Sequence, residues 1–390
     1  MTMHSRPQPS LTQLFMSFLR LGATAFGGPS MVAYIRKMAV DDKHWLDHEN
    51  FRDGVALCQT IPGATAMQTA AYVGLRARGT IGAGTSFIGF GLPAFCLMMT
   101  LSALYAQTRT LPFVVSAFEG LQAIIVAIVA NATLSFANTS ITGWNRAFIA
   151  AIAAALFGVG LNPIIVIVLA ALGGLVLVPS KPILPRSYVD PGRPFRSMKP
   201  LFFLVAITVT GFVALYLFQP MLFDIAALMF RIDLFAFGGG FASVPLMYHE
   251  IVHVRSWMDG PTFLNGIVLG QVTPGPIVIT ATFVGYWLHG LLGGLIATLS
   301  VFLPSFIMVI GFVPFFDKLR ASPYFSKVLA GILCSFVGLL LTVTIRFAGN
   351  VHWDLARIIL ASSALGALLL KVDILWVVVV GTIISVIVVR

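Results

Sequence analysis

Charge is what this sequence has least of. Only 10% of its 390 residues are Asp, Glu, Lys or Arg, whereas a soluble domain carries about 25%. Apolar residues make up 58% of the chain, and its mean hydropathy is +0.96. Many apolar runs exceed the roughly 20 residues that a helix needs to span a bilayer. The composition excludes a soluble domain and predicts an all-α polytopic membrane protein.

Acidic residues and cysteines are also scarce. The chain has 14 acidic and 24 basic residues, and the basic ones are scattered in short loops, a pattern typical of the positive-inside bias rather than of a nucleic-acid interface. The expected partners are therefore membrane lipid and a transported solute, not nucleic acid. Cys58, Cys96 and Cys334 lie in apolar contexts and have no metal-ligand spacing, so no metal and no cofactor is expected. A homodimer is an assembly that the sequence leaves open.

Catalytic pairs and targeting segments are absent from the pattern as well. An intramembrane enzyme would need paired His or Asp residues within the apolar runs, and we find none, so we expect a protein that is not an enzyme. The first ten residues are polar and no short apolar core with a cleavage site follows them, so no signal peptide is expected.

The two halves of the chain repeat one another. Ala25-Phe26-Gly27-Gly28 recurs as Ala236-Phe237-Gly238-Gly239, and Gln59 with Pro62-Gly63 recurs as Gln271 with Pro274-Gly275. The offsets are 237 − 26 = 211 and 271 − 59 = 212. So many matches in one register indicate an internal duplication.

An extra apolar element between the copies predicts their orientation. We divide the chain into a first repeat half (1–178), a basic cytoplasmic linker (179–200), one extra connecting helix (201–220) and a second repeat half (221–390). The first half has about six apolar elements, so one more crossing turns the second copy upside down, as in the inverted repeats of secondary transporters. About 13 apolar elements are expected in a multi-pass inner-membrane protein whose N-terminus is cytoplasmic and whose C-terminus is outside. This topology treats 36–50 as a polar loop on the outer side.

Two interruptions recur inside apolar runs, where Pro and Gly should be least common. Pro62-Gly63 and Pro274-Gly275-Pro276 each break a helix, since Pro lacks an N–H group and Gly loosens the remaining ladder. Within a membrane, a broken helix persists only where protein or a water-filled cavity satisfies the freed backbone groups. The breaks, spanning or re-entrant, therefore predict a binding site.

The same residues carry a resemblance to a known family. Phe-Gly-Gly, Trp, Gln-x-x-Pro-Gly and Leu-Pro-[Ala/Ser]-Phe occur in this order in both halves, and the set resembles the chromate ion transporter family in its long two-domain form, with the best-matching stretch at 269–306. The resemblance implies export of chromate and chromate resistance, with sulfate as a similar ion. One departure is Ala64, which stands where the second half has Pro276. The alternative that we keep is a sulfate or other anion importer or exchanger on the same scaffold.

A tetrahedral dianion needs hydrogen-bond donors and positive potential. A helix that restarts after a break supplies both, because its first N–H groups are unpaired and its N-terminus carries about half a positive charge. Gln59, Gln271 and Thr273 add side-chain donors, and Arg20 and Arg231 occupy equivalent intramembrane positions. The candidate substrate-binding residues are Arg20, Phe26, Gly27, Gly28, Gln59, Pro62, Gly63, Arg231, Phe237, Gly238, Gly239, Gln271, Thr273, Pro274, Gly275 and Pro276.

Structural readings of the same residues stay open at this stage. The Gly/Pro breaks are also typical of helix packing, and the two glutamines could cap freed carbonyls. The two arginines could extend to the interface, or pair with Asp233 or a lipid phosphate. Glu119 is a weak candidate for a coupling proton, against a hydrogen bond between helices.

Overall fold

The chain forms a purely helical bundle in the part that the structure describes. The computed structural model describes residues 8–26, 30–179, 199–315 and 322–388, which contain no strand. The first repeat comprises α1 (Leu11–Thr24), α2 (Ser30–Arg36), the π-helix η1 (Lys37–Asp42), α3 (His48–Thr60), α4 (Thr65–Thr108), α5 (Pro112–Ser140), α6 (Trp144–Gly158) and α7 (Pro163–Leu177). After α8 (Lys199–Phe218), the second comprises α9 (Pro220–Phe235), η2 (Gly240–Ala242), α10 (Ser243–Tyr248), η3 (His249–Val254), α11 (Gly260–Val272), η4 (Ile277–Ile279), α12 (Thr280–Phe312), η5 (Val313–Phe315), α14 (Pro323–Asn350), α15 (Leu355–Leu369) and α16 (Ile374–Val388).

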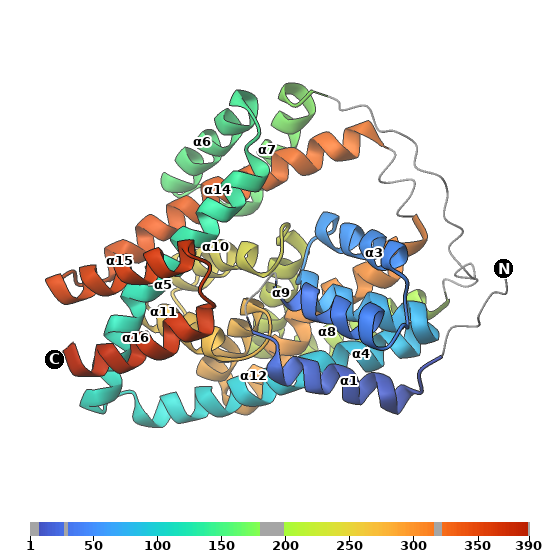
Figure 1. Ribbon diagram of the computed structural model, residues 1–390, viewed down its shortest axis with the longest axis horizontal. Helices are drawn as coiled ribbons and strands as arrows, with labels where there is room; N and C mark the ends of the chain where they lie inside the picture. The colour runs from blue at the N-terminus through green and yellow to red at the C-terminus, as the bar shows by residue number, and fades with distance from the viewer. Residues whose placement is uncertain (1–7, 27–29, 180–198, 316–321, 389–390) are drawn as a thin grey trace.

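Five of the described helical stretches are long and apolar enough to cross a membrane. They are α4, α5, α8, α14 and the stretch from η4 through α12 to η5. Figure 1 shows α6 and α7 beside α14 at the top of the view, α15 and α16 on the left, and α1 with α4 along the bottom. The fold class, an all-α polytopic membrane protein, is confirmed. The predicted linker falls largely on residues 180–198, which lie outside the described residues.

Each of the long helices α4 and α12 contains a sharp turn. The backbone leaves helical geometry at Arg78 and Gly79 in α4, and at His289 and Gly290 in α12. In α4, Ser86 Oγ donates to the carbonyl of Ala70 over 2.7 Å, although a straight helix would hold residues 16 apart at about 24 Å. Both helices therefore fold back on themselves, with Gly79 and Gly290 at positive φ (68° and 57°) where the turn requires glycine.

The Pro-Gly breaks are the tips of re-entrant hairpins. The hydroxyl of Tyr72 in α4 donates to the carbonyl of Asn50 at the start of α3, and Arg76 donates to the Asn50 side chain over 2.7 Å. The two arms thus lie side by side and begin and end at the same level. In the second repeat, a side chain on Gly266 of α11 would meet the Phe283 ring of α12 at 2.4 Å, so these arms also pack against each other.

The segment 36–50, which the sequence presents as a polar loop, is partly helical. The helix that begins at α2 continues as η1 to Asp42, because Ala39 and Val40 are buried among the core residues. The second repeat forms the equivalent π-helix η3. Each π-helix is followed by one residue at positive φ, His44 (52°) and Ser256 (49°), which are 212 positions apart.

A pseudo-two-fold axis relates the repeats. Thr133 of α5 contacts its own counterpart, Thr344 of α14, at 3.3 Å (344 − 133 = 211). The contacts are also reciprocal, since α5 packs on α15 and α16 while α14 packs on α6 and α7. Phe136 of α5 and Leu333 of α14 both lie next to Gly238. A step forward along α5, from Thr133 to Phe136, therefore corresponds to a step backward along α14, from Thr344 to Leu333. The two helices thus run antiparallel. Antiparallel central helices are what an inverted repeat produces.

Candidate functional site

Each Pro-Gly corner is held by the other repeat. The N–H of Gly63 donates to the Ala236 carbonyl over 2.9 Å, and the N–H of Gly275 donates to the Ala25 carbonyl over 3.1 Å. Both glycines adopt positive φ, 118° and 117°, which an L side chain rarely adopts. Each Pro-Gly corner is therefore hydrogen-bonded to the alanine that precedes the Phe-Gly-Gly of the other repeat.

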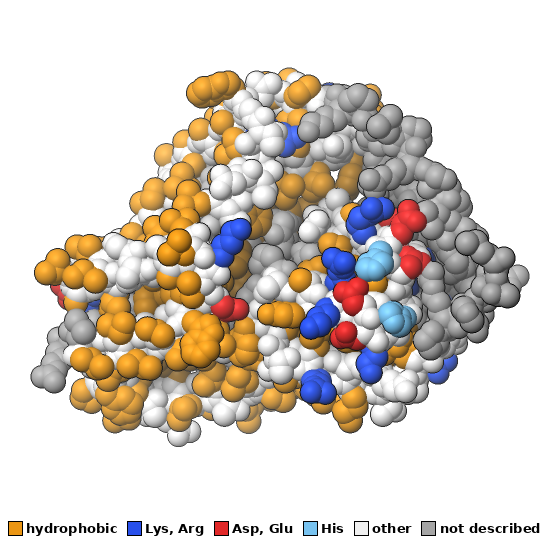
Figure 2. All heavy atoms as spheres, in the orientation of Figure 1, with side chains coloured by type: hydrophobic (Ala, Val, Ile, Leu, Met, Phe, Trp, Pro, Cys, Tyr) orange, Lys and Arg blue, Asp and Glu red, His pale blue; other side chains and the backbone are white. Residues whose placement is uncertain are grey.

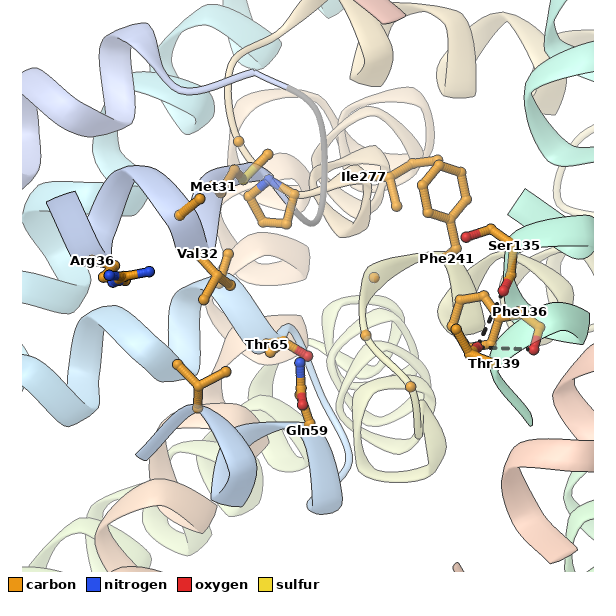
Figure 3. A pocket seen from close by; sticks show the side chains of 18 of the residues that line it. Met31, Val32, Arg36, Gln59, Thr65, Ser135, Phe136, Thr139, Phe241 and Ile277 are labelled. Carbon is orange, nitrogen blue, oxygen red and sulfur yellow. Dashed lines mark hydrogen bonds between the residues drawn. The ribbon is translucent and has the colours of Figure 1, made fainter. Parts of the chain in front are cut away.

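A cavity of about 1370 Å³ opens beside these corners (Figure 3). Residues of both repeats line it. The predicted site residues among them are Phe26, Gln59, Gly238, Gly239, Gln271, Thr273, Gly275 and Pro276. Phe136 and Phe241 lie across the cavity from Met31 and Val32 and give it an apolar wall (Figure 3).

Helices that restart after a break begin at this cavity. Thr65 and Ala66 start α4, and Ile277 starts η4, which leads into α12. No side chain caps either start, since the N-cap positions Ala64 and Pro276 make no side-chain hydrogen bond to the following turn. The first N–H groups of a helix carry positive potential, so uncapped starts at a cavity suit a negatively charged ligand.

An amide side chain lies near the C-terminal end of α3 and of α11, the helices that lead into the two Pro-Gly corners. Gln59 lines the cavity beside Thr65, as Figure 3 shows. Gln271 lines it from the second repeat, and its buried amide nitrogen has no acceptor among the described residues. The hydroxyl of Thr273 instead donates to the Gly270 carbonyl over 2.9 Å, so this side chain is engaged within its own arm.

Charged side chains gather at one end of the cavity, over α3 (Figure 2). Arg36, His48, Glu49 and Arg52 belong to the lining, and all four are exposed. Glu49 is paired with Arg52 at 3.8 Å. Basic groups at this end favour the approach of an anion over long range, an effect that salt screens.

The structure does not bring Arg20 and Arg231 to the cavity. Arg20 is exposed on α1. Arg231 pairs at 2.5 Å with Glu250, a residue whose side chain is only 8% exposed, and not with Asp233. Equivalent positions in two inverted repeats need not face one cavity, and here the cation neutralises a buried carboxylate of the π-helix.

The other predicted residues lie around the corners. Pro62, Gly63 and Pro274 are buried behind the lining, and Phe237 is half-buried. Gly27 and Gly28 fall outside the described residues. Gly63 and Gly275 differ in their surroundings, because a side chain at Gly63 would meet Ser305 Oγ at 2.1 Å whereas one at Gly275 would meet the Ala94 methyl at 2.8 Å.

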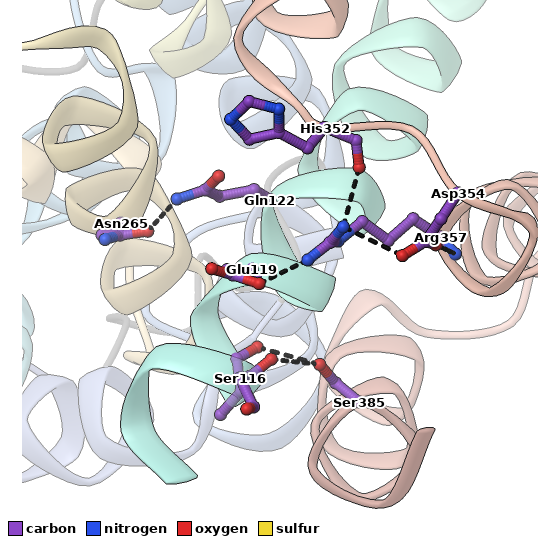
Figure 4. A network of polar contacts seen from close by, with 9 residues as sticks. Ser116, Glu119, Gln122, Asn265, His352, Asp354, Arg357 and Ser385 are labelled. Carbon is purple, nitrogen blue, oxygen red and sulfur yellow. Dashed lines mark hydrogen bonds and ion pairs between the residues drawn. The ribbon is translucent and has the colours of Figure 1, made fainter. Parts of the chain in front are cut away.

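Glu119 lies in a separate polar network between α5 and α15 (Figure 4). Its carboxylate forms an ion pair with Arg357, which also pairs with Asp354 at 3.0 Å. The structure thus gives Glu119 the helix-bridging contact that was the alternative to a proton-carrying role. Gln122 and Asn265 bond to each other next to this network, and Asn265 continues to the hydroxyl of Tyr105.

A buried cluster that the sequence interpretation missed lies behind the first corner. Asp233 Oδ2 accepts from the N–H of Ser305 over 2.9 Å and from its hydroxyl over 2.7 Å. The N–H of Ala64 donates to the same hydroxyl oxygen over 2.9 Å. A comparison of the two repeats could have pointed to this cluster, because the first-repeat positions equivalent to Asp233 and Ser305 are Gly22 and Ala94. These two residues have no polar side chain and cannot form the same hydrogen bonds.

Comparison with known proteins finds relatives that cover both halves of the chain. The chromate transporter family model matches the chain twice, at residues 12–175 and 223–386, which are again 211 positions apart. An uncharacterized transporter of Methanocaldococcus jannaschii is 45% identical over 92% of this chain and 89% of its own length. Chromate transport proteins of Pseudomonas aeruginosa and Cupriavidus metallidurans are 31% and 29% identical, over 88% and 95% of this chain and 82% and 90% of their own lengths. No solved structure matches the chain significantly. The chain belongs to the chromate transporter family.

Proposed function

We propose that this protein exports chromate, a tetrahedral dianion, from the cytoplasm by alternating access and thereby confers chromate resistance. The observation that carries the proposal is the cavity at which the uncapped starts of α4 and η4 meet the amides of Gln59 and Gln271. Each repeat contributes one helix start and one amide. Four acceptor oxygens of one ion can engage donors from both sides.

The lining is selective for negative charge. Glu49 is the one carboxylate among the described residues that line the cavity, and its neighbour Arg52 offsets it at the charged end. The deeper lining is made of backbone, amide, hydroxyl and apolar groups. A divalent cation would find few oxygen ligands there, whereas an oxyanion finds N–H donors, and none of the described residues of the deeper lining carries a carboxylate.

The hairpins support an orientation with the charged end of the cavity in the cytoplasm. Because α3 enters and α4 returns on one side, the loop containing Lys43 lies on the same side as Arg76 and Arg78. The sequence interpretation had placed this loop outside, which weakened the positive-inside argument. With re-entrant arms, basic residues from both segments gather on the side of the basic linker.

The ends of the chain follow from the same geometry. Leu11 at the start of α1 lies beside Ile81, just after the α4 turn, so the N-terminus is on this cytoplasmic side. Five of the described helical stretches are long and apolar enough to cross, and an odd number of crossings supports a C-terminus on the outer side. In this orientation the structure represents an inward-facing state, ready to accept an anion from the cytoplasm. The outward-facing state would exchange the roles of the two repeats around the pseudo-two-fold axis.

The membrane potential favours this direction. Moving a dianion outward across 100 mV, negative inside, releases about 4–5 kcal/mol, from roughly 2.3 kcal/mol per charge. Concentrative import of the same ion would have to overcome this term with several co-transported cations. Export therefore agrees with both the electrical driving force and the inward-facing cavity.

Inside-out membrane vesicles test the proposal. Vesicles that contain the protein should accumulate chromate when their interior is made positive, and vesicles without it should not. Counterflow in proteoliposomes with labelled sulfate then measures selectivity. The export proposal fails if the protein moves only sulfate, inward and driven by protons, which is the result expected of an importer on the same scaffold.

A further inference from the structure

Asp233 is buried where no charged group compensates it. The residue is 0% exposed, and it lies on α9 at the back of the first Pro-Gly corner. No Lys, Arg or His nitrogen of the described residues lies within ion-pair distance of its carboxylate. The helices packed against α9 are α8, α10 and α12, and the charged residues on these four helices besides Asp233 are Asp224, Arg231, Lys199 and His289, none of which forms an ion pair with Asp233. The other titratable groups there are Tyr216, Tyr248 and Tyr286. A carboxylate in such a place is costly in its ionised form.

The hydrogen bonds around Asp233 are one donor short. Oδ2 accepts both bonds from Ser305, but the buried Oδ1 has no partner among the described residues. The carbonyl oxygen of the Gln68 side chain, at the same corner, is also buried and without a partner. Its amide nitrogen is committed to the Pro62 carbonyl at 2.6 Å, which fixes the orientation of the amide.

These two groups surround one point of the backbone. A side chain at Gly63 would meet Gln68 Nε2 at 2.7 Å and Asp233 Oδ2 at 3.2 Å. The two side chains therefore meet at one corner, and each keeps one buried acceptor, Gln68 Oε1 and Asp233 Oδ1, without a donor among the described residues. Unpartnered buried acceptors are rare in folded proteins, and a carboxylic acid supplies the donor that a carboxylate cannot.

We propose that Asp233 is a proton-binding site whose occupancy controls how tightly the cavity binds the dianion. The proton resides on Oδ1, while Oδ2 keeps its bonds from Ser305. The link to the cavity is short, because Ser305 Oγ accepts from Ala64, the residue directly before the uncapped start of α4. An ionised Asp233 satisfies the positive potential of this helix start and repels a second anion. A protonated Asp233 leaves that potential for the ligand.

The site makes the two repeats unequal. The first-repeat positions equivalent to Asp233 and Ser305 are Gly22 and Ala94, and at the second corner Gly275 faces the Ala94 methyl group. Since only the second repeat has this Asp-Ser pair, we expect one proton to be bound for each dianion. This inference rests on the proposed function only for its ligand, since the proton site itself can be measured without any anion.

The first measurement detects the proton directly. Infrared difference spectra of the purified full chain are recorded between about pH 5 and about pH 9. The parent should show a carboxylic-acid band that disappears at the higher pH, and Asp233→Asn and Asp233→Ala should both lack it. Glu119→Gln is the matched control, because it removes a carboxylate that is already paired with Arg357. A band that persists in both Asp233 variants would overturn the proposal.

The second measurement tests the link to the ligand. Sulfate stays a dianion over this pH range, so any pH dependence of its affinity comes from the protein. If one proton is taken up with the anion, the affinity of the parent rises by up to about tenfold for each unit that the pH falls. Asp233→Asn should bind sulfate tightly at every pH. An unchanged slope in Asp233→Asn would overturn the link, whereas a parent that binds neither sulfate nor chromate would refute the proposed function and leave the infrared result to decide the proton site.

Discussion

Substitution of Gln271 by Leu is the sharpest test of the side-chain donors. Gln271 lines the cavity at the end of α11, and its buried amide nitrogen donates to no described protein group. A donor that the fold leaves unused costs the protein free energy, and a bound anion would recover it once the amide turns toward the cavity. Leu has a similar volume and removes both polar atoms, so the fold loses no internal hydrogen bond from the amide nitrogen.

The expected magnitude follows from one charge-assisted hydrogen bond. Such a bond contributes about 1.5–3 kcal/mol, so Gln271→Leu should weaken the binding of chromate by about 10- to 150-fold. Titration of the detergent-purified protein with chromate, followed by tryptophan fluorescence or calorimetry, measures this change. The melting temperature of the variant should equal or slightly exceed that of the parent.

Gln122→Leu is the matched control for this substitution. Gln122 is also buried, but its amide donates to Asn265 over 2.8 Å, away from the cavity. Its replacement strands a buried acceptor and should lower stability by about 1–3 kcal/mol without changing the chromate affinity. If Gln271→Leu binds chromate as tightly as the parent does, the assignment of Gln271 to the site is wrong.

Three further outcomes follow from the corners and the buried ion pair. Gly63→Ala and Gly275→Ala should each cost about 1–3 kcal/mol of backbone strain, because both glycines have positive φ. Gly63→Ala should lower the melting temperature more, because its methyl group would meet Ser305 Oγ at 2.1 Å. Equal melting temperatures of the two variants would contradict this order. Arg231→Gln should destabilise the protein by leaving the buried Glu250 with only its longer contact to Arg255 (3.8 Å), while chromate affinity stays at the parent level. Adding Glu250→Gln should restore most of the lost melting temperature, and a double variant no more stable than Arg231→Gln would rule out the ion pair as the cause.

Much of the fold could be read from the sequence because membrane helices are local. Apolar length predicts the spans, and the repeat offset of 211 predicts the duplication, which the matched family segments reproduce. The positions of the Pro-Gly breaks also follow from residue type alone, because Pro and Gly act on their own backbone. Whether an interrupted helix continues or folds back depends on contacts such as that between Tyr72 and Asn50, which no local pattern encodes.

The site also contains residues that local sequence predicts and residues that only the folded structure reveals. The glutamines next to the breaks were predicted, since residues adjacent to a corner must lie near it, and both line the cavity. Arg20 and Arg231 are predicted site residues because a cation is costly in a membrane, but Arg20 is exposed and Arg231 is satisfied by the carboxylate of Glu250, whose position depends on tertiary packing. The Asp233–Ser305 pair joins residues 72 apart in the chain, so only a comparison of the two repeats could have pointed to it.

The central claim is that a tetrahedral dianion rests between the two Pro-Gly corners, at the starts of α4 and η4. An anomalous difference map from crystals soaked in molybdate, a heavier ion of the same shape and charge, locates the ligand directly. A peak is expected in the cavity, within about 4 Å of the N–H groups that follow Ala64 or Pro276. A peak beside Arg231 or Arg20, with none in the cavity, would contradict it.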